Sequence, residues 1–88
     1  MPTVFRFEGY RVVVYPNDHR PAHVHVIGNG NEAVFILNCP ASTVINAGPV
    51  QIRENYGFTA KDIKRIMATL DRNVAMLCQE WRSIHGKA

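Results

Sequence analysis

A short segment near the start of the chain, residues 17–26, holds most of the side chains that could do chemistry. Three of the four histidines of the chain lie in it: His19, His23 and His25. Imidazole titrates near neutral pH and binds transition metals, so these side chains could act as acids, bases or ligands. Asp18 and Arg20 would add a carboxylate and a phosphate-binding guanidinium beside them.

The spacing of His23 and His25 predicts that both imidazoles point to the same side of a β-strand. Side chains alternate between the two faces along a strand, so residues two apart share a face. We expect a strand over 23–27 in which Val24 and Val26 face the core. The two histidines would then project outward, away from apolar packing.

A metal site is one interpretation of this pattern. His23 and His25 could bind one ion, with zinc as a candidate, and His19 or Asp18 could supply a third ligand. The ligand spacing of a standard site is incomplete, so the sequence commits to no cofactor.

Three further interpretations need no metal. His23 and His25 could be a catalytic acid–base pair that cleaves a phosphodiester. Arg20, Arg6 or Arg11 would then stabilise the phosphate charge. Alternatively, a binding surface could contact nucleic acid or a partner protein without catalysis; its residues would be Asp18, His19, Arg20, His23 and His25. Finally, the histidines could simply occupy a half-exposed strand face. The sequence leaves open whether the protein is an enzyme.

The elements that must position these groups are predicted by the spacing of apolar residues. Alternating patterns and turn residues predict an antiparallel sheet of four or five strands within residues 3–54. The expected strands are 3–7, 10–15, 23–27, 32–38 and 50–53, with a weaker candidate at 43–46.

A single long helix is expected over about residues 60–85. Thr59 followed by Asp62 is typical of a capping box at its start. Apolar residues then recur at spacings of three and four: Ile63, Ile66, Met67, Leu70, Val74, Leu77, Trp81 and Ile84. His85 would lie at the helix C-terminus, as a cap or as a neighbour of the other histidines if the helix reaches their strand.

The length of this helix has a consequence for packing. It would extend roughly 39 Å at 1.5 Å per residue, whereas strands of five or six residues span about 17–20 Å. Either the helix kinks, or its distal half needs another cover. We expect self-association, for example as a homodimer, or a small partner protein at these residues: Val74, Leu77, Trp81 and Ile84.

Size and composition point to one α+β domain over residues 1–88. The net charge of +3 permits nucleic acid or another anionic partner without requiring one. No run of about 18 apolar residues predicts a membrane span, and the N-terminus has no signal-peptide pattern. We therefore expect a cytoplasmic protein in which Cys39 and Cys78 are free, buried thiols.

Three groups of residues resemble one known family. They are Met1–Arg6 with Gly9–Arg11, the segment Tyr15–Val26, and Gly57-Phe58 leading into a helix that ends near Trp81 and His85. The chain resembles the small prokaryotic "domain of unknown function 4160" family over nearly its whole length. The resemblance implies a stand-alone cytoplasmic protein, often encoded beside the "domain of unknown function 2442" family in an arrangement like a toxin–antitoxin pair.

Together these observations favour a toxin–antitoxin-like component that binds a partner protein or nucleic acid through the loop and strand Asp18–His25. The alternative is a toxin of the ribonuclease or phosphodiesterase type, metal-dependent or histidine-based, that uses His23 and His25. Neither substrate nor partner can be named from the sequence.

Overall fold

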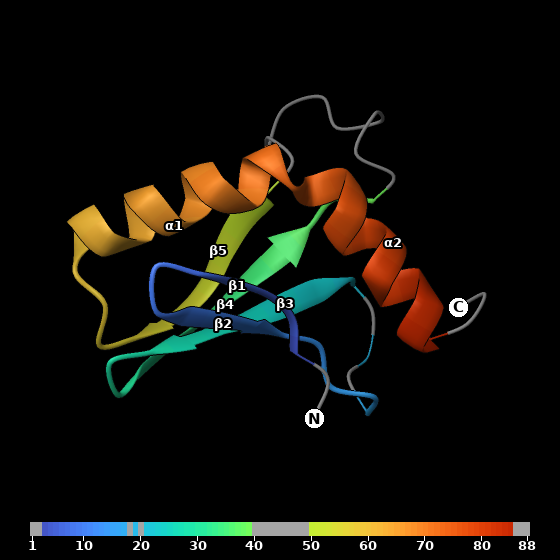
Figure 1. Ribbon diagram of the computed structural model, residues 1–88, viewed down its shortest axis with the longest axis horizontal. Helices are drawn as coiled ribbons and strands as arrows, with labels where there is room; N and C mark the ends of the chain where they lie inside the picture. Colours follow the sequence, from blue (N-terminus) through green and yellow to red (C-terminus); the bar gives the residue numbers. More distant parts are fainter. Residues whose placement is uncertain (1–2, 18, 20, 40–49, 86–88) are drawn as a thin grey trace.

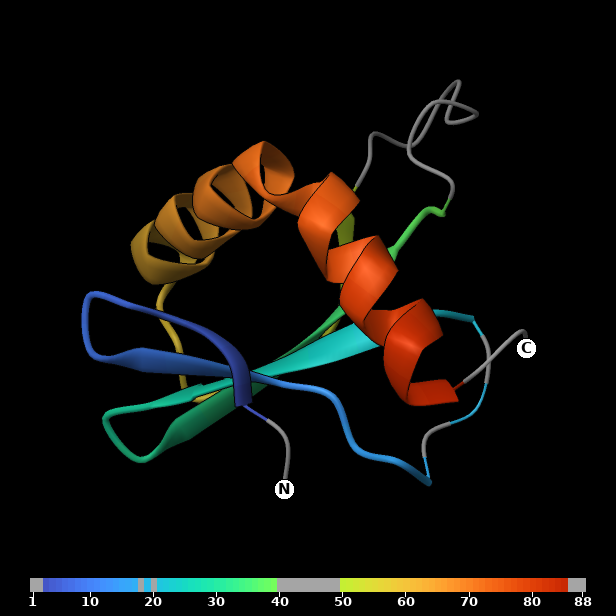
Figure 2. The same cartoon turned by 45° about the vertical axis from the view of Figure 1, so that its right-hand side comes forward.

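The computed structural model of the chain describes residues 3–17, 19, 21–39 and 50–85. The described residues form five strands followed by two helices: β1 (Thr3–Phe7), β2 (Tyr10–Val13), β3 (His23–Gly28), β4 (Asn31–Leu37), β5 (Val50–Tyr56), α1 (Ala60–Arg72) and α2 (Val74–His85). Both helices lie on the same side of the sheet (Figures 1 and 2). The predicted α+β class is confirmed, and the weaker strand candidate at 43–46 lies outside the described residues.

Each strand of the sheet pairs with its neighbour in the chain. The order is β1-β2-β3-β4-β5, and every pair is antiparallel. Two tight turns make this possible, because Glu8-Gly9 and Asn29-Gly30 all have positive φ angles. Positive φ at both central residues is the conformation that matches the twist of a two-residue hairpin. These turns form the β1–β2 and β3–β4 hairpins, in which the chain folds back on itself.

One face of the sheet forms the core, as the sequence predicted. Val12 lies opposite Val26, and Val26 lies opposite Ala33. These side chains and the neighbouring Val24 and Phe35 have no exposed surface. The helices cover this face with side chains that are also fully buried: Ile66, Leu70 and Leu77.

The helical region is two helices and not the single helix predicted over 60–85. The start is as predicted, since Thr59 and Asp62 form a capping box with an Asp62 N–Thr59 Oγ1 distance of 3.1 Å. The break falls at Asn73, whose backbone N–H donates to the carbonyl of Leu70. Its side-chain amide also donates to the Thr69 carbonyl, 2.8 Å away. Asparagine competes in this way for backbone groups of a helix, which explains why α1 ends there.

The break changes how the distal apolar residues are covered. Val74, Leu77 and Trp81 are 9%, 0% and 3% exposed and belong to the core of the chain itself, while Ile84 packs against that core partly buried. The kink, which was one of the two alternatives that the helix length left open, therefore provides the cover that a partner would otherwise supply. Self-association through these residues stays a prediction that packing no longer demands.

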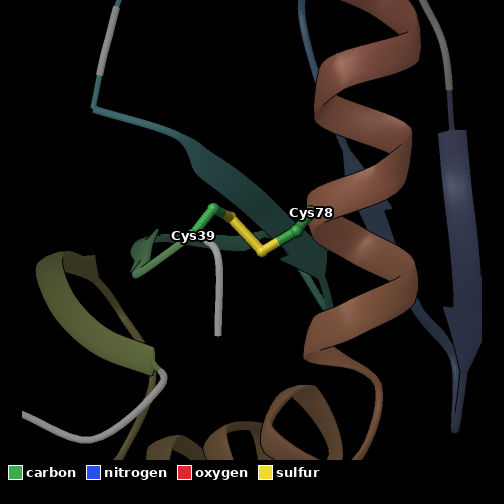
Figure 3. The surroundings of a disulfide bond; sticks show 2 residues. All are labelled: Cys39 and Cys78. Carbon is green, nitrogen blue, oxygen red and sulfur yellow. A yellow bond between two sulfur atoms is a disulfide. The ribbon is translucent and has the colours of Figure 1, made fainter. Parts of the chain in front are cut away.

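A disulfide bond joins Cys39 to Cys78 across 39 positions of sequence, so the prediction of two free thiols is wrong. Cys39 lies two residues after the end of β4, and Cys78 lies in α2 (Figure 3). Because the kink at Asn73 carries α2 across the end of β4, the two Cα atoms come within 5.9 Å. Sequence spacing alone gave no sign of this approach. Neither helix in the described residues has the length and apolar character that crossing a bilayer requires.

Candidate functional site in a cluster of aromatic rings

His23 and His25 lie on the same face of β3, as their spacing predicted. Their ring centroids are 5.3 Å apart, in an edge-to-face arrangement. The ring of Tyr15, which follows β2, approaches His25 from the other side with a centroid distance of 4.6 Å. The pair of imidazoles is thus part of a larger assembly of rings.

The expectation that both histidines project outward is wrong. His23 is only 6% exposed, and the side chain of His25 is 15% exposed. Trp81 of α2 covers His23, with 5.3 Å between their ring centroids. The kink turns α2 across the start of β3, and the sequence specified neither the position of the kink nor the direction of α2 after it.

His85 joins the assembly through Trp81. The two rings stack with centroids 3.8 Å apart and an interplanar angle of 23°, and His85 Nδ1 lies 3.2 Å from the carbonyl oxygen of Trp81. The sequence allowed His85 near the other histidines if the helix end reached their strand, and α2 brings it there. We call these five side chains the ring cluster: Tyr15, His23, His25, Trp81 and His85.

His23 ties the preceding loop to the ring cluster. Its Nδ1 lies 2.8 Å from the carbonyl oxygen of Pro21, and a carbonyl only accepts, so Nδ1 carries the proton and donates. The backbone of Ala22, the residue after Pro21, is fixed as well, because the Leu37 N–H donates to its carbonyl at 2.8 Å. The end of the loop is therefore held by hydrogen bonds from β3 and β4.

His25 pairs with a carboxylate that the sequence analysis did not single out. Its Nδ1 lies 3.1 Å from Glu32 Oε2, and the Glu32 side chain is 42% exposed. In the β3–β4 hairpin His25 opposes Val34 and Ile27 opposes Glu32, so His25 and Glu32 are diagonal neighbours on one face. The hairpin register set by the Asn29-Gly30 turn was the signal that could have found Glu32. A carboxylate in this position fixes the orientation of the His25 ring.

The row of polar side chains continues to β5 on the same face. Tyr56 opposes Glu32 across the β4–β5 ladder, and its hydroxyl donates to Glu54 Oε1 at 3.0 Å. This hydrogen bond is the main cause of a raised Tyr56 pKa; the negative charge of Glu54, a little desolvation and the charge of Glu32 add to it. Acidic groups therefore border the ring cluster on the β5 side.

The other predicted site residues are not gathered at the ring cluster. His19 is exposed, and Asp18 and Arg20 lie outside the described residues. Among the described residues, no group of three or more histidine, cysteine, aspartate or glutamate side chains is arranged to hold a metal ion. The proposed ligand set of His19, His23 and His25 is thus not assembled there.

On α2, the side-chain atoms Trp81 Nε1 and His85 Nε2 are buried without a hydrogen bond to any described residue. Buried polar groups usually have a partner. These two atoms therefore mark the part of α2 whose contacts are least complete.

The protein is a small α+β domain. Its antiparallel meander is covered on one face by a kinked helix pair, and the ring cluster packs at one end of the sheet. The chain belongs to the family described as domain of unknown function (DUF4160), whose sequence profile matches residues 9–82. The match includes His23, His25 and Trp81 and ends before His85. No curated protein and no solved structure matches the chain.

Proposed function

We propose that this protein is a small cytoplasmic, toxin–antitoxin-like component that binds a partner through the loop and strand Asp18–His25. In this proposal the ring cluster is a scaffold and the loop is the contact surface. The partner is a protein or a nucleic acid of negative charge, because the chain carries a net charge of +3.

The hydrogen bond between His23 Nδ1 and the Pro21 carbonyl carries this proposal. His23 is buried and its Nδ1 is engaged, so its ring supports the loop more readily than it meets a substrate. His19 and Pro21, in contrast, are exposed. A loop whose end is fixed before binding loses less conformational entropy when a partner docks, which favours affinity.

A binding experiment tests the proposal with matched arginine variants. Fluorescence anisotropy would measure binding of a mixed-sequence single-stranded RNA and of a co-expressed "domain of unknown function 2442" protein. Arg20→Ala removes a charge from the loop, and Arg53→Ala removes one from exposed β5. We expect Arg20→Ala to weaken binding by about tenfold or more, as loss of a charged hydrogen bond does, and Arg53→Ala to have little effect.

The two kinds of partner differ in salt dependence, since nucleic acid releases counterions and its affinity falls steeply with added salt. Equal affinities for Arg20→Ala and Arg53→Ala would place the contact elsewhere. Absence of binding to both probes would refute the proposal.

Acid–base catalysis is a second candidate, favoured by the contact between His25 and Glu32. A histidine held by a carboxylate beside a second imidazole resembles the base–orienter arrangement of hydrolytic enzymes. If His25 cleaves RNA, His25→Ala should lower the rate by about 100-fold or more. Glu32→Gln should lower the rate as well, because the neutral amide holds the His25 ring less firmly than the carboxylate does. Equal cleavage by the wild type and His25→Ala would rule out this role.

A further inference from the structure

The Cys39–Cys78 disulfide connects the end of the sheet to the helix that covers the ring cluster. Cys39 is exposed after β4, whereas Cys78 is 4% exposed within α2. Trp81 lies three residues beyond Cys78, about one turn of helix, and its ring packs on His23. A covalent bond thus holds α2 one turn away from the rings that it covers.

The rest of the attachment of α2 is apolar. Its buried residues are Val74, Leu77, Cys78 and Trp81, and within the described residues no ion pair joins α2 to the sheet. Polar contacts also hold α1: the Thr59 capping box and an Arg65–Glu8 ion pair at 3.6 Å that reaches the β1–β2 turn. The helical hydrogen-bond ladder is interrupted at Asn73, so α2 is not a rigid continuation of α1.

We infer that the disulfide is a redox-dependent clamp that holds α2, and through α2 the ring cluster, in place. When the bond is formed, Trp81 covers His23, and His23 holds the preceding loop through its hydrogen bond to Pro21. When the bond is reduced, α2 loosens and Trp81 withdraws from His23. A weaker hold on the loop then lowers its affinity for a partner, and this last step rests on the proposed function.

The chemistry is thiol–disulfide exchange with a thiol or dithiol reductant. A thiolate attacks the sulfur of exposed Cys39, forming a mixed disulfide and releasing the Cys78 thiolate, which takes a proton from water. A second thiol then attacks the external sulfur of the mixed disulfide and frees Cys39. Two external thiols are oxidised to a disulfide, and the protein gains two electrons and two protons. The reverse exchange with an oxidised thiol pool restores the clamp.

In the proposed cytoplasmic location, this reaction would make the disulfide reversible. Disulfides in a reducing compartment are usually transient and serve redox sensing, whereas permanent ones belong to oxidising compartments. One residue of the pair, Cys39, is exposed, which favours access of small thiols and reductases to the bond. The clamp would therefore report the thiol balance around the protein.

Hydrogen exchange of the full chain, read by mass spectrometry, tests the clamp without any binding partner. Oxidised wild type is compared with the protein reduced by dithiothreitol, and α1 serves as the internal control. We expect reduction to speed exchange in α2 by about tenfold or more, while α1 and the β3–β4 pair stay within about twofold. Trp81, the single tryptophan, should shift its emission to longer wavelength as its ring becomes exposed.

The variant Cys39→Ser/Cys78→Ser serves as the matched control. It should behave like the reduced protein in both buffers, and single-site Cys39→Ser should do the same. Unchanged α2 exchange in the reduced wild type would overturn the clamp. Equal acceleration of α1 and the sheet would also overturn it, because the bond would then be a staple of the whole fold. Failure of the RNA or protein binding assays would leave these outcomes unaffected, so the two proposals fail separately.

Discussion

His23 offers the sharpest test of whether the ring cluster is a scaffold, and the prediction is that His23→Ala destabilises the fold. The imidazole is 6% exposed and packs between Trp81 and His25. Imidazole is smaller than the ring of Phe or Trp, so its truncation to alanine is set at about 2 kcal/mol, the low end for a buried side chain such as Leu or Met. Losing the hydrogen bond to the Pro21 carbonyl adds about 1 kcal/mol. The expected loss in the free energy of unfolding is therefore about 3 kcal/mol.

Urea denaturation followed by circular dichroism measures this loss, with two matched variants. His19→Ala removes an exposed imidazole and should change the free energy of unfolding by less than about 0.5 kcal/mol. His23→Asn can place an amide N–H near the position of Nδ1 and should recover about 1 kcal/mol of the loss. If His23→Ala unfolds at the same urea concentration as His19→Ala, His23 is not a buried support and the scaffold reasoning is refuted.

Three further predictions follow from local contacts. Thr59→Ala removes the capping box of α1 and should lower the free energy of unfolding by about 1 kcal/mol, measured by thermal denaturation; an unchanged midpoint would contradict it. Glu54→Gln should return the Tyr56 pKa toward its ordinary 10.0 in an NMR titration of the ring. Since folding raises this pKa, the pair stabilises the fold below pH 10 and the gain disappears as pH rises through the folded value. Gly57→Ala places a methyl group against the Asn31 side chain at a φ of +107°, so it should destabilise the protein by about 1–3 kcal/mol in urea.

The sheet was predictable because its determinants are local. Alternating valines and the two glycine turns specify each hairpin, and the hairpin register then decides which side chains share a face. The common face of His23 and His25 followed from these rules. So did the buried face that carries Val24 and Val26.

The surroundings of the histidines were not predictable from local pattern. Apolar periodicity runs through Asn73 without a gap, so it gives no sign that the helix stops and restarts there. The break decides three things at once: the cover over His23, the place of His85, and the approach of Cys78 to Cys39. Each depends on the direction that α2 takes after Asn73, and apolar residues spaced three and four apart do not specify that direction.

The sequential order of the strands also bears on how the protein is made. Each hairpin closes a short loop and can form within about 1–10 μs, so the sheet can assemble as the chain leaves the ribosome. The helices that cover it follow the sheet in the chain and are synthesised after it. About 30 residues separate the end of β5 from the end of α2, which at about 5–20 residues per second leaves the apolar face bare for roughly 1.5–6 s. During that interval chaperones can bind the apolar face of the nascent sheet, and slow codons after residue 56 would keep this face exposed for longer.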